Sequence, residues 1–147
     1  MWKTAVILML AVTSGQAGLS KLEAISMIET ADRDWVVGSA GERSRYQIMP
    51  KVWSAYTSSR EYKNPQLARA VAERHLTSLE ETFFKATGRE ASDFDRYVLW
   101  NGGPTYYAKI GYDAKRVHPV IRERAERYVN LRHMKNDLMP TPLFAMR

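Results

Sequence analysis

The stretch NPQLARAVAERHLTSLEETFFKATG, residues 64–88, decides the fold class. Asn64 is a favoured N-cap residue, and Pro65 suits the first turn of a helix because its fixed φ is already helical. Apolar side chains then recur at helical spacing, at Leu67, Val71, Leu76, Leu79 and Phe83. Gly88 follows as a typical helix stop. The stretch therefore predicts one long helix with a buried apolar face.

The segments on both sides of this stretch also have helical patterns. Ser20 and Glu23 form a capping box, which predicts a helix over about 21–30. The remaining helices are predicted over about 46–56, 93–101 and 119–131. The loops between them fall at 31–44 and 104–117. No segment alternates polar and apolar residues with a period of two, so we expect an all-α, mostly helical protein.

Size and composition limit the possible functions. The chain has 147 residues, of which 45% are hydrophobic and 26% charged, enough for one globular core but not for two full domains. The absence of cysteine excludes disulfide scaffolds and thiol nucleophiles, and the three histidines lack metal-ligand spacing. We therefore expect no metal. The net charge of +6 favours an anionic partner, and no nucleic-acid motif accompanies it.

Residues 1–17, MWKTAVILMLAVTSGQA, have the layout of a secretory signal peptide. Lys3 provides a positive start, an uncharged stretch of 10 residues follows, and Ala17 stands at a small-residue cleavage site. Ten helical residues rise about 15 Å, half of a hydrocarbon core, so a stable membrane anchor is not expected. We predict an exported protein with one domain over residues 18–132 and an irregular tail over 133–147. The alternative is that the first segment is a buried helix.

Glu29 is the residue whose position calls for a chemical explanation. It shares a helical stripe with Leu22 and Ile25, so its carboxyl is predicted to lie on an apolar face. Burial disfavours the charged form, and so does the negative end of the helix dipole in the last turn. A raised carboxyl pKa is what a general acid needs near neutral pH. The alternative is a partly exposed Glu29 paired with Arg33.

Three segments, in order, resemble the signatures of the soluble lytic transglycosylases. They are Glu29-Thr30, residues 41–50 (GERSRYQIMP) and residues 99–104 (LWNGGP). In that family a Glu-Ser pair ends a helix, a loop of the type Ser-x-x-Gly-Ala-x-Gly-Leu-Met-Gln-Ile-Met-Pro follows, and an Ala-Tyr-Asn-Ala-Gly-Pro-Gly segment comes later. Residues 127–129 (RYV) are similar to a closing Asn-Tyr-Val segment. The resemblance spans about residues 20–131.

The resemblance implies both a fold and an activity. The fold is lysozyme-like, with a glycan groove between two lobes. The activity is cleavage of the β-1,4 bond between N-acetylmuramic acid and N-acetylglucosamine in peptidoglycan, without a cofactor. Glu29 takes the place of a single catalytic residue that acts first as acid and then as base, and the product is a 1,6-anhydro end. The expected partner is then the glycan strand of the bacterial cell envelope, in the periplasm or outside the cell.

The motif positions also imply substrate-binding residues around the acid. They are Thr30, Ser39, Tyr46, Gln47, Trp100 and Asn101. Aromatic faces suit sugar rings, which adds Trp35, Tyr106 and Tyr107 as groove candidates, whereas helical spacing puts Trp53, Tyr97 and Tyr128 in the core. The chain departs from the family at Ser44 and Arg45, which replace Gly and Leu, and at Trp100, which offers an indole N–H in place of a phenol.

Two other functions remain open from the sequence. A hydrolase on the same fold needs a second carboxylate to activate water, and Glu42, Asp32 and Asp34 are the candidates. Glu42 lies inside the motif loop, although a surface partner for Arg43 or Arg45 is its simpler interpretation. The third possibility is a non-catalytic glycan-binding or secretion-associated homologue. The last helix is basic, with Arg122, Arg124 and Arg127. These side chains are predicted either to form an ordinary solvated face or to attract the protein to the anionic cell wall.

Overall fold

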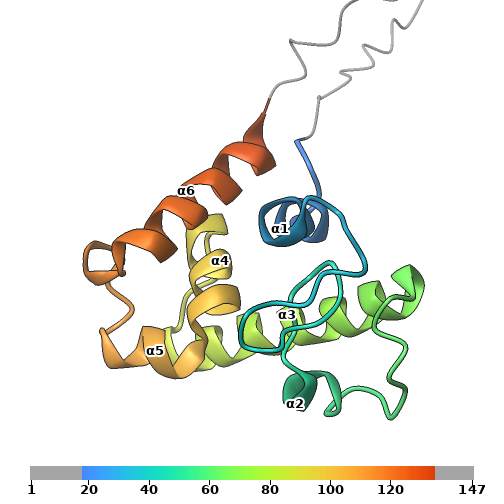
Figure 1. The fold of residues 1–147 in the computed structure, drawn as a ribbon. Coiled ribbons are helices and arrows are strands. Elements are labelled where there is room, and N and C mark those ends of the chain that lie inside the picture. The colour runs from blue at the N-terminus through green and yellow to red at the C-terminus, as the bar shows by residue number, and fades with distance from the viewer. Residues whose placement is uncertain (1–17, 135–147) are drawn as a thin grey trace, which may run out of the picture.

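The computed structural model describes residues 18–134, and its helices are arranged as in Figure 1. The elements are α1 (Lys21–Thr30), α2 (Pro50–Trp53), α3 (Pro65–Thr87), α4 (Asp93–Gly102), α5 (Pro104–Lys109), a 3-10 helix (Ala114–Arg116) and α6 (Pro119–His133). Residues 18–134 contain no strand, only an isolated antiparallel bridge between Arg43 and Ile48. The prediction of a mostly helical protein is confirmed.

Two predictions about the ends of the chain fall largely outside this range. The predicted signal peptide, residues 1–17, lies outside the described residues, as do residues 135–147 of the predicted tail. His133 was assigned to that tail, but it is the last residue of α6. Between residues 18 and 134, no helix combines the length and apolar character needed to cross a membrane.

The predicted caps set the ends of the first and longest helices. The Ser20 hydroxyl accepts from the Glu23 amide, and the Glu23 carboxylate accepts from the Ser20 amide over 2.8 Å, which completes the capping box. The Asn64 side chain accepts from the amide of Leu67 over 3.0 Å, and Gly88 ends α3 with a φ of 71°. Local sequence therefore determines where α1 and α3 begin.

The predicted helix over 46–56 is wrong. Only Pro50–Trp53 is helical, because Ser44 and Gln47 have left-handed backbones with φ of 64° and 51°. The preceding residue, Met49, is extended, as is usual before proline. The motif segment before Pro50 is therefore a tight loop. The direction of the Gln47 side chain is set by this loop and not by a helix.

The predicted loop over 104–117 is also wrong. Gly103 ends α4 with a φ of 82°, and Pro104 directly begins α5 at its first position. Tyr107 anchors this short helix: it is fully buried, and its hydroxyl donates to Asp95 over 2.6 Å. Pro104 follows two glycines, which favour a helix stop, but a proline at the first helical position is equally a start signal.

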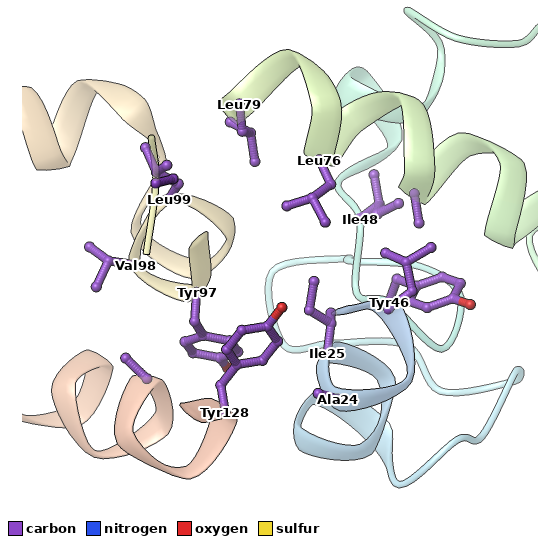
Figure 2. Close-up of a cluster of buried hydrophobic side chains, with 14 of the residues drawn as sticks. Ala24, Ile25, Tyr46, Ile48, Leu76, Leu79, Tyr97, Val98, Leu99 and Tyr128 are labelled. Carbon is purple, nitrogen blue, oxygen red and sulfur yellow. The ribbon is translucent and has the colours of Figure 1, made fainter. Parts of the chain in front are cut away.

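The core lies where α4 meets its neighbours. α4 packs against α6, α3 and α5, and α1 packs against α6 and α3. Tyr97 of α4 and Tyr128 of α6 lie with ring centroids 5.6 Å apart, and Figure 2 shows both rings beside Ile25 of α1. The two tyrosines and Trp53 are buried, as predicted. Because α6 packs against both α1 and α4, this core fixes α1 relative to α4.

Ion pairs add to the fixed position of α1. Glu80 of α3 accepts from Lys21 of α1 over 2.8 Å and also pairs with Arg96 of α4. Arg96 in turn donates to Asp93 over 2.8 Å. The amide of Leu19 donates to the last turn of α6. Near its start, α1 is thus tied directly to α3, to α4 through Glu80, and to α6 through the preceding Leu19.

Candidate active site

A cavity of about 420 Å³ lies between the end of α1, the loop over 38–49, α3 and the end of α4. Its polar lining consists of Glu29, Ser39, Glu42, Gln47, Asn101 and Arg124, with His75 and Trp100 beside them. Ile48, Met49, Val52, Leu79 and Leu99 supply the apolar part. A volume of this size and a mixed lining are typical of small-ligand and sugar sites.

The three motifs meet in this cavity. Glu29 comes from the first segment, Gln47 from the second and Asn101 from the third, and all three line the same walls. These residues are separated by 18 and 54 positions in the sequence. Sequence order alone does not bring them together, so their convergence is a property of the fold.

The Glu29 carboxyl is half-buried and accepts a hydrogen bond over 2.7 Å from the hydroxyl of Tyr97. The alternative partner, Arg33, instead donates its Nε–H to the carbonyl of Thr30 over 2.7 Å. Glu29 therefore faces the α4 side of the cavity and not the surface arginine one turn on.

The pKa of Glu29 is raised above its ordinary value, chiefly because burial penalises the charged form. The Tyr97 hydrogen bond, the nearby Arg124 charge and Asn101 act in the opposite direction, and Glu42 adds a small like-charge contribution that raises the pKa. Desolvation prevails over these partners. Protonation of Glu29 is therefore favoured to a higher pH than for an exposed carboxyl.

Tyr97 is locked as a donor in this pair. Burial, and then the charge of Glu29, raise the pKa of its hydroxyl far above the ordinary value. The phenol therefore stays protonated and donates a hydrogen bond to Oε1 of Glu29. The other carboxylate oxygen, Oε2, is left to carry the proton of the acid form.

Gln47 is fixed by its own loop. Its Nε2 donates to the carbonyl of Ser44 over 3.1 Å and to that of Val36 over 3.3 Å. Its backbone is left-handed. With both donors directed at carbonyls, Oε1 is the Gln47 atom still available as an acceptor beside Gly38.

Glu42 lies in the cavity and is not a partner of the neighbouring arginine. Its carboxylate accepts from the amide of Ala40 over 3.0 Å. Arg45 instead binds Asp34 through two hydrogen bonds of 2.7 Å, and it lies 3.7 Å from Asp32. Neither aspartate lines the Glu29 cavity. Of the three candidates for a second carboxylate, Glu42 alone shares that cavity.

Gly38 makes room for both loop side chains. A Cβ on Gly38 would come within 3.0 Å of the carboxylate end of Glu42 and of Oε1 of Gln47. Aligned without a gap, the resemblance puts the loop serine at this position, one residue before Ser39. The structure shows instead why glycine stands here: the side chains of Glu42 and Gln47 occupy the space that a Cβ would need.

Two predicted binding residues lie beneath the loop and not in the cavity. Thr30 is buried, and its hydroxyl donates to the carbonyl of Arg45 over 3.0 Å and accepts from the amide of Arg33. Tyr46 is 4% exposed. Thr30 thus holds the loop against α1 and Tyr46 anchors the loop in the core, in place of the substrate contacts predicted for them.

Most of the aromatic candidates also lie elsewhere. Trp100 lines the cavity, but its N–H donates to the carbonyl of Tyr46 over 3.2 Å and so fixes the loop. The Tyr106 hydroxyl accepts from the amide of His118 over 2.8 Å, and its ring lies against Gly102. Tyr107 is buried. Trp35 is exposed and lines a different cavity.

Sequence reasoning missed two residues that line the cavity, Arg124 and His75, and one buried residue, Tyr97, that reaches it through Glu29. Tyr97 was assigned only to the core, although its spacing of four from Asn101 puts both on one face of α4 and was a usable signal. Arg124 was assigned to a solvated face of α6, and nothing local marks it. His75 contacts the Tyr56 hydroxyl over 3.2 Å through Nδ1, and burial lowers its pKa.

Comparison with known proteins yields no relative. No protein-family model, no curated protein and no solved structure matches this chain. Within residues 18–134, no group of three or more histidine or carboxylate side chains is placed to hold a metal ion.

Proposed function

We propose that this protein is an exported, lysozyme-like enzyme that cleaves peptidoglycan by lytic transglycosylation, with Glu29 as its acid and then its base. The observation that carries the proposal is the environment of Glu29. Its carboxyl is half-buried, has a raised pKa, accepts from Tyr97, and shares one cavity with Gln47 and Asn101. This is the arrangement expected of a general acid beside a glycosidic bond.

The backbone of the motif loop gives independent support to the family resemblance. The family's loop carries glycine at the positions of Gly41 and Ser44. Both residues have left-handed backbones here, with φ of 89° and 64°, a conformation that favours glycine. The backbone at both positions therefore has the conformation that the motif's glycines would favour, although residue 44 is a serine in this chain.

The proposed reaction uses one carboxyl twice. Oε2 of Glu29 donates its proton to the glycosidic oxygen as the bond to the muramic acid carbon breaks. The substrate's N-acetyl group stabilises the cationic centre, which is a known alternative to a second carboxylate. Glu29, now charged, takes the proton of the muramic 6-hydroxyl, whose oxygen closes the 1,6-anhydro ring. Tyr97 steadies the carboxylate during this second step.

Glu42 favours a second candidate function, hydrolysis on the same scaffold. Its carboxylate lies in the Glu29 cavity, where it can act on a water molecule. A hydrolase would then use Glu29 as the acid and Glu42 as the base. The two reactions differ in their product, because water gives a reducing end and transglycosylation gives an anhydro end.

Digestion of purified sacculi, followed by mass analysis of the fragments, tests the proposal. We expect anhydro-muropeptides from the wild-type protein and a loss of about 10²- to 10⁴-fold for Glu29→Gln. Glu42→Gln should keep most of the activity if the enzyme is a transglycosylase and lose it if the enzyme is a hydrolase. Glu126→Gln, at an exposed carboxylate of α6, is the matched control and should behave as wild type.

Three results would contradict parts of the proposal. Reducing ends in place of anhydro ends would replace transglycosylation with hydrolysis. Full activity of Glu29→Gln would remove Glu29 from its role as acid. The absence of any product from folded wild-type protein would favour the non-catalytic glycan-binding alternative.

A further inference from the structure

A second cavity, of about 470 Å³, uses other residues of the loop that carries Gln47. Residues 34–37 and 43–44 form one wall, and residues 60–64, just before α3, form the other. A third cavity beside α2 shares Arg43, Arg60 and Tyr62 with it. These residues border both hollows, and we call the two hollows together the basic groove.

The aromatic and apolar part of the basic groove is open to solvent. Trp35 is 64% exposed and Val37 is 55% exposed. Tyr62 is half-buried, and its ring packs edge-on against the buried Trp53 with centroids 4.9 Å apart. An exposed tryptophan beside a firmly held tyrosine offers flat apolar faces of the kind on which sugar rings stack.

The charged part of the groove has an excess of cations. Arg43, Lys51, Arg60 and Lys63 line it, whereas its acids are Glu61 and Asp34. Asp34 is already bound by Arg45. The groove therefore favours an anionic ligand.

Arg43 carries an unused donor in this groove. Its guanidinium carbon lies 5.7 Å from the centroid of the Tyr62 ring. Its enclosed Nε–H makes no hydrogen bond to any residue between 18 and 134. Solvent does not reach this atom, so an anion in the groove would bind the rest of the Arg43 guanidinium, and the enclosed Nε–H would gain a partner when the side chain turns toward the anion.

We propose that the basic groove is a second, non-catalytic binding site for an acidic glycan strand. Sugar rings would stack on Trp35 and Tyr62, and carboxylates would bind the cations around Arg43. The choice of glycan rests on the proposed function, since the same polymer would enter the Glu29 cavity. The hydrogen bond from Gln47 to the Val36 carbonyl joins a residue of that cavity to the wall of the groove.

Such a site would keep the enzyme on its polymer. A strand bound in the groove keeps further glycosidic bonds at high local concentration near Glu29. The affinity for a strand bound at both sites would therefore exceed the affinity of either site alone. The groove is built by residues 34–37 and 43–44, the segment before α3 and residues beside α2, and it shares no lining residue with the Glu29 cavity. Its occupation therefore does not require the cleavage cavity to be filled.

The test is a titration of the Glu29→Gln protein, observed through NMR signals of side-chain N–H groups. The acidic probe is a soluble tetrasaccharide of alternating N-acetylglucosamine and N-acetylmuramic acid, and the neutral probe is chitotetraose. We expect the Trp35 indole and Arg43 Nε–H signals to shift saturably with the acidic probe and several-fold less with the neutral one. Trp35→Ala should abolish the Arg43 response.

Matched variants separate this site from general surface effects. Lys63→Gln should weaken acidic binding by about two- to fivefold, as expected for one rim charge, and Lys85→Gln, in the last turn of α3, should not. Phe84→Ala removes another exposed aromatic side chain, 47% exposed on α3, and should leave the titration unchanged. Trp35 is largely exposed, so its removal is expected to leave the fold intact.

The outcomes distinguish this proposal from the proposed function. If sacculi are cleaved normally but Trp35 and Arg43 do not respond, the groove proposal is wrong and the catalytic one stands. If sacculi are not cleaved but both signals respond to the acidic probe, the reverse holds. Equal responses to acidic and neutral probes would also overturn the proposal, because the cations would then have no role.

Discussion

The hydroxyl of Tyr97 donates a hydrogen bond of 2.7 Å to Oε1 of Glu29, a residue 68 positions earlier in the chain. This contact links α4 to α1 at the cavity. It sets which carboxylate oxygen carries the acid proton, and it moderates the rise in the pKa of Glu29 that burial causes. Tyr97 is therefore the first residue through which the proposed mechanism is tested.

Tyr97→Phe removes the donor and keeps the ring. Because the hydrogen bond lowers the pKa of Glu29, its loss should raise that pKa further. The basic limb of the pH–activity profile should then move to higher pH, since a general acid must be protonated. Activity near pH 7 should fall by up to about 100-fold because the carboxyl loses its fixed orientation. Turnover of sacculi measured across pH checks both expectations.

Tyr128→Phe is the matched control. Its ring lies 5.6 Å from that of Tyr97, and its buried hydroxyl finds no hydrogen-bond partner within residues 18–134. Removing this hydroxyl should leave the pH profile in place and cost no stability. If both phenylalanine variants moved the profile equally, Tyr97 would be acting through packing and not through its hydrogen bond.

Glu29→Gln should make the protein more stable at neutral pH. The folded-state pKa of Glu29 is raised, so the native state binds more protons than the unfolded one above the unfolded pKa of about 4.5. Ionisation of Glu29 therefore lowers the free energy of unfolding as pH rises through that range. Glutamine does not ionise and still accepts from Tyr97. Urea unfolding at pH 7 and pH 4 should show a gain that disappears at the lower pH, and equal stability at pH 7 would contradict burial of the charge.

Local signals in the sequence were enough for much of the fold. The caps at Ser20 and Asn64 act within three residues, so the sequence alone located the starts of α1 and α3. The loop before α2 was different, because Thr30 and Trp100, 15 and 54 positions away, hold it through hydrogen bonds to the carbonyls of Arg45 and Tyr46. The sequence around Pro104 is compatible both with a loop after α4 and with the start of a new helix. The burial of Tyr107 favours the helix, α5.

The candidate site was predictable only where one helix defined it. The helical stripe shared with Leu22 and Ile25 identified Glu29 as a carboxyl on an apolar face. Its partner Tyr97 has the same helical spacing as other core residues, and nothing local separates a core tyrosine from one that reaches a carboxylate. Arg124 reaches the cavity from α6, the last helix, and that proximity exists only in the folded chain.

Asp95 should provide stability that is lost in acid. Burial alone would raise its pKa, but hydrogen bonds from Arg89, Tyr107 and Ser92 outweigh burial and lower the pKa to about 2. A lowered carboxyl pKa stabilises the fold above the unfolded pKa of about 3.8, and this contribution disappears as pH falls toward 2. Asp95→Asn should cost about 2–3 kcal/mol at pH 7, through loss of a cap and of charged hydrogen bonds.

Thermal unfolding at pH 7 and pH 2.5 measures this effect. The difference in unfolding temperature between wild type and Asp95→Asn should be smaller at pH 2.5 than at pH 7. Asp113→Asn is the control, since Asp113 is exposed and caps only a short 3-10 helix. A loss of stability that stayed constant from pH 7 to pH 2.5 would mean that the charge of Asp95 is not its source.

Two glycines of the motif loop should separate activity from stability. Gly38→Ala places a Cβ against the ends of Glu42 and Gln47, which are flexible, so both side chains should move while the backbone stays in place. We expect a change of less than about 1 kcal/mol in stability and a fall of about 100-fold in activity. Gly41→Ala meets nothing within 4 Å, but its φ of 89° is strained for alanine and should cost about 1–2 kcal/mol. Urea unfolding and sacculus digestion of the two variants should therefore give opposite patterns. Full activity of Gly38→Ala would show that the positions of Glu42 and Gln47 do not matter for the reaction.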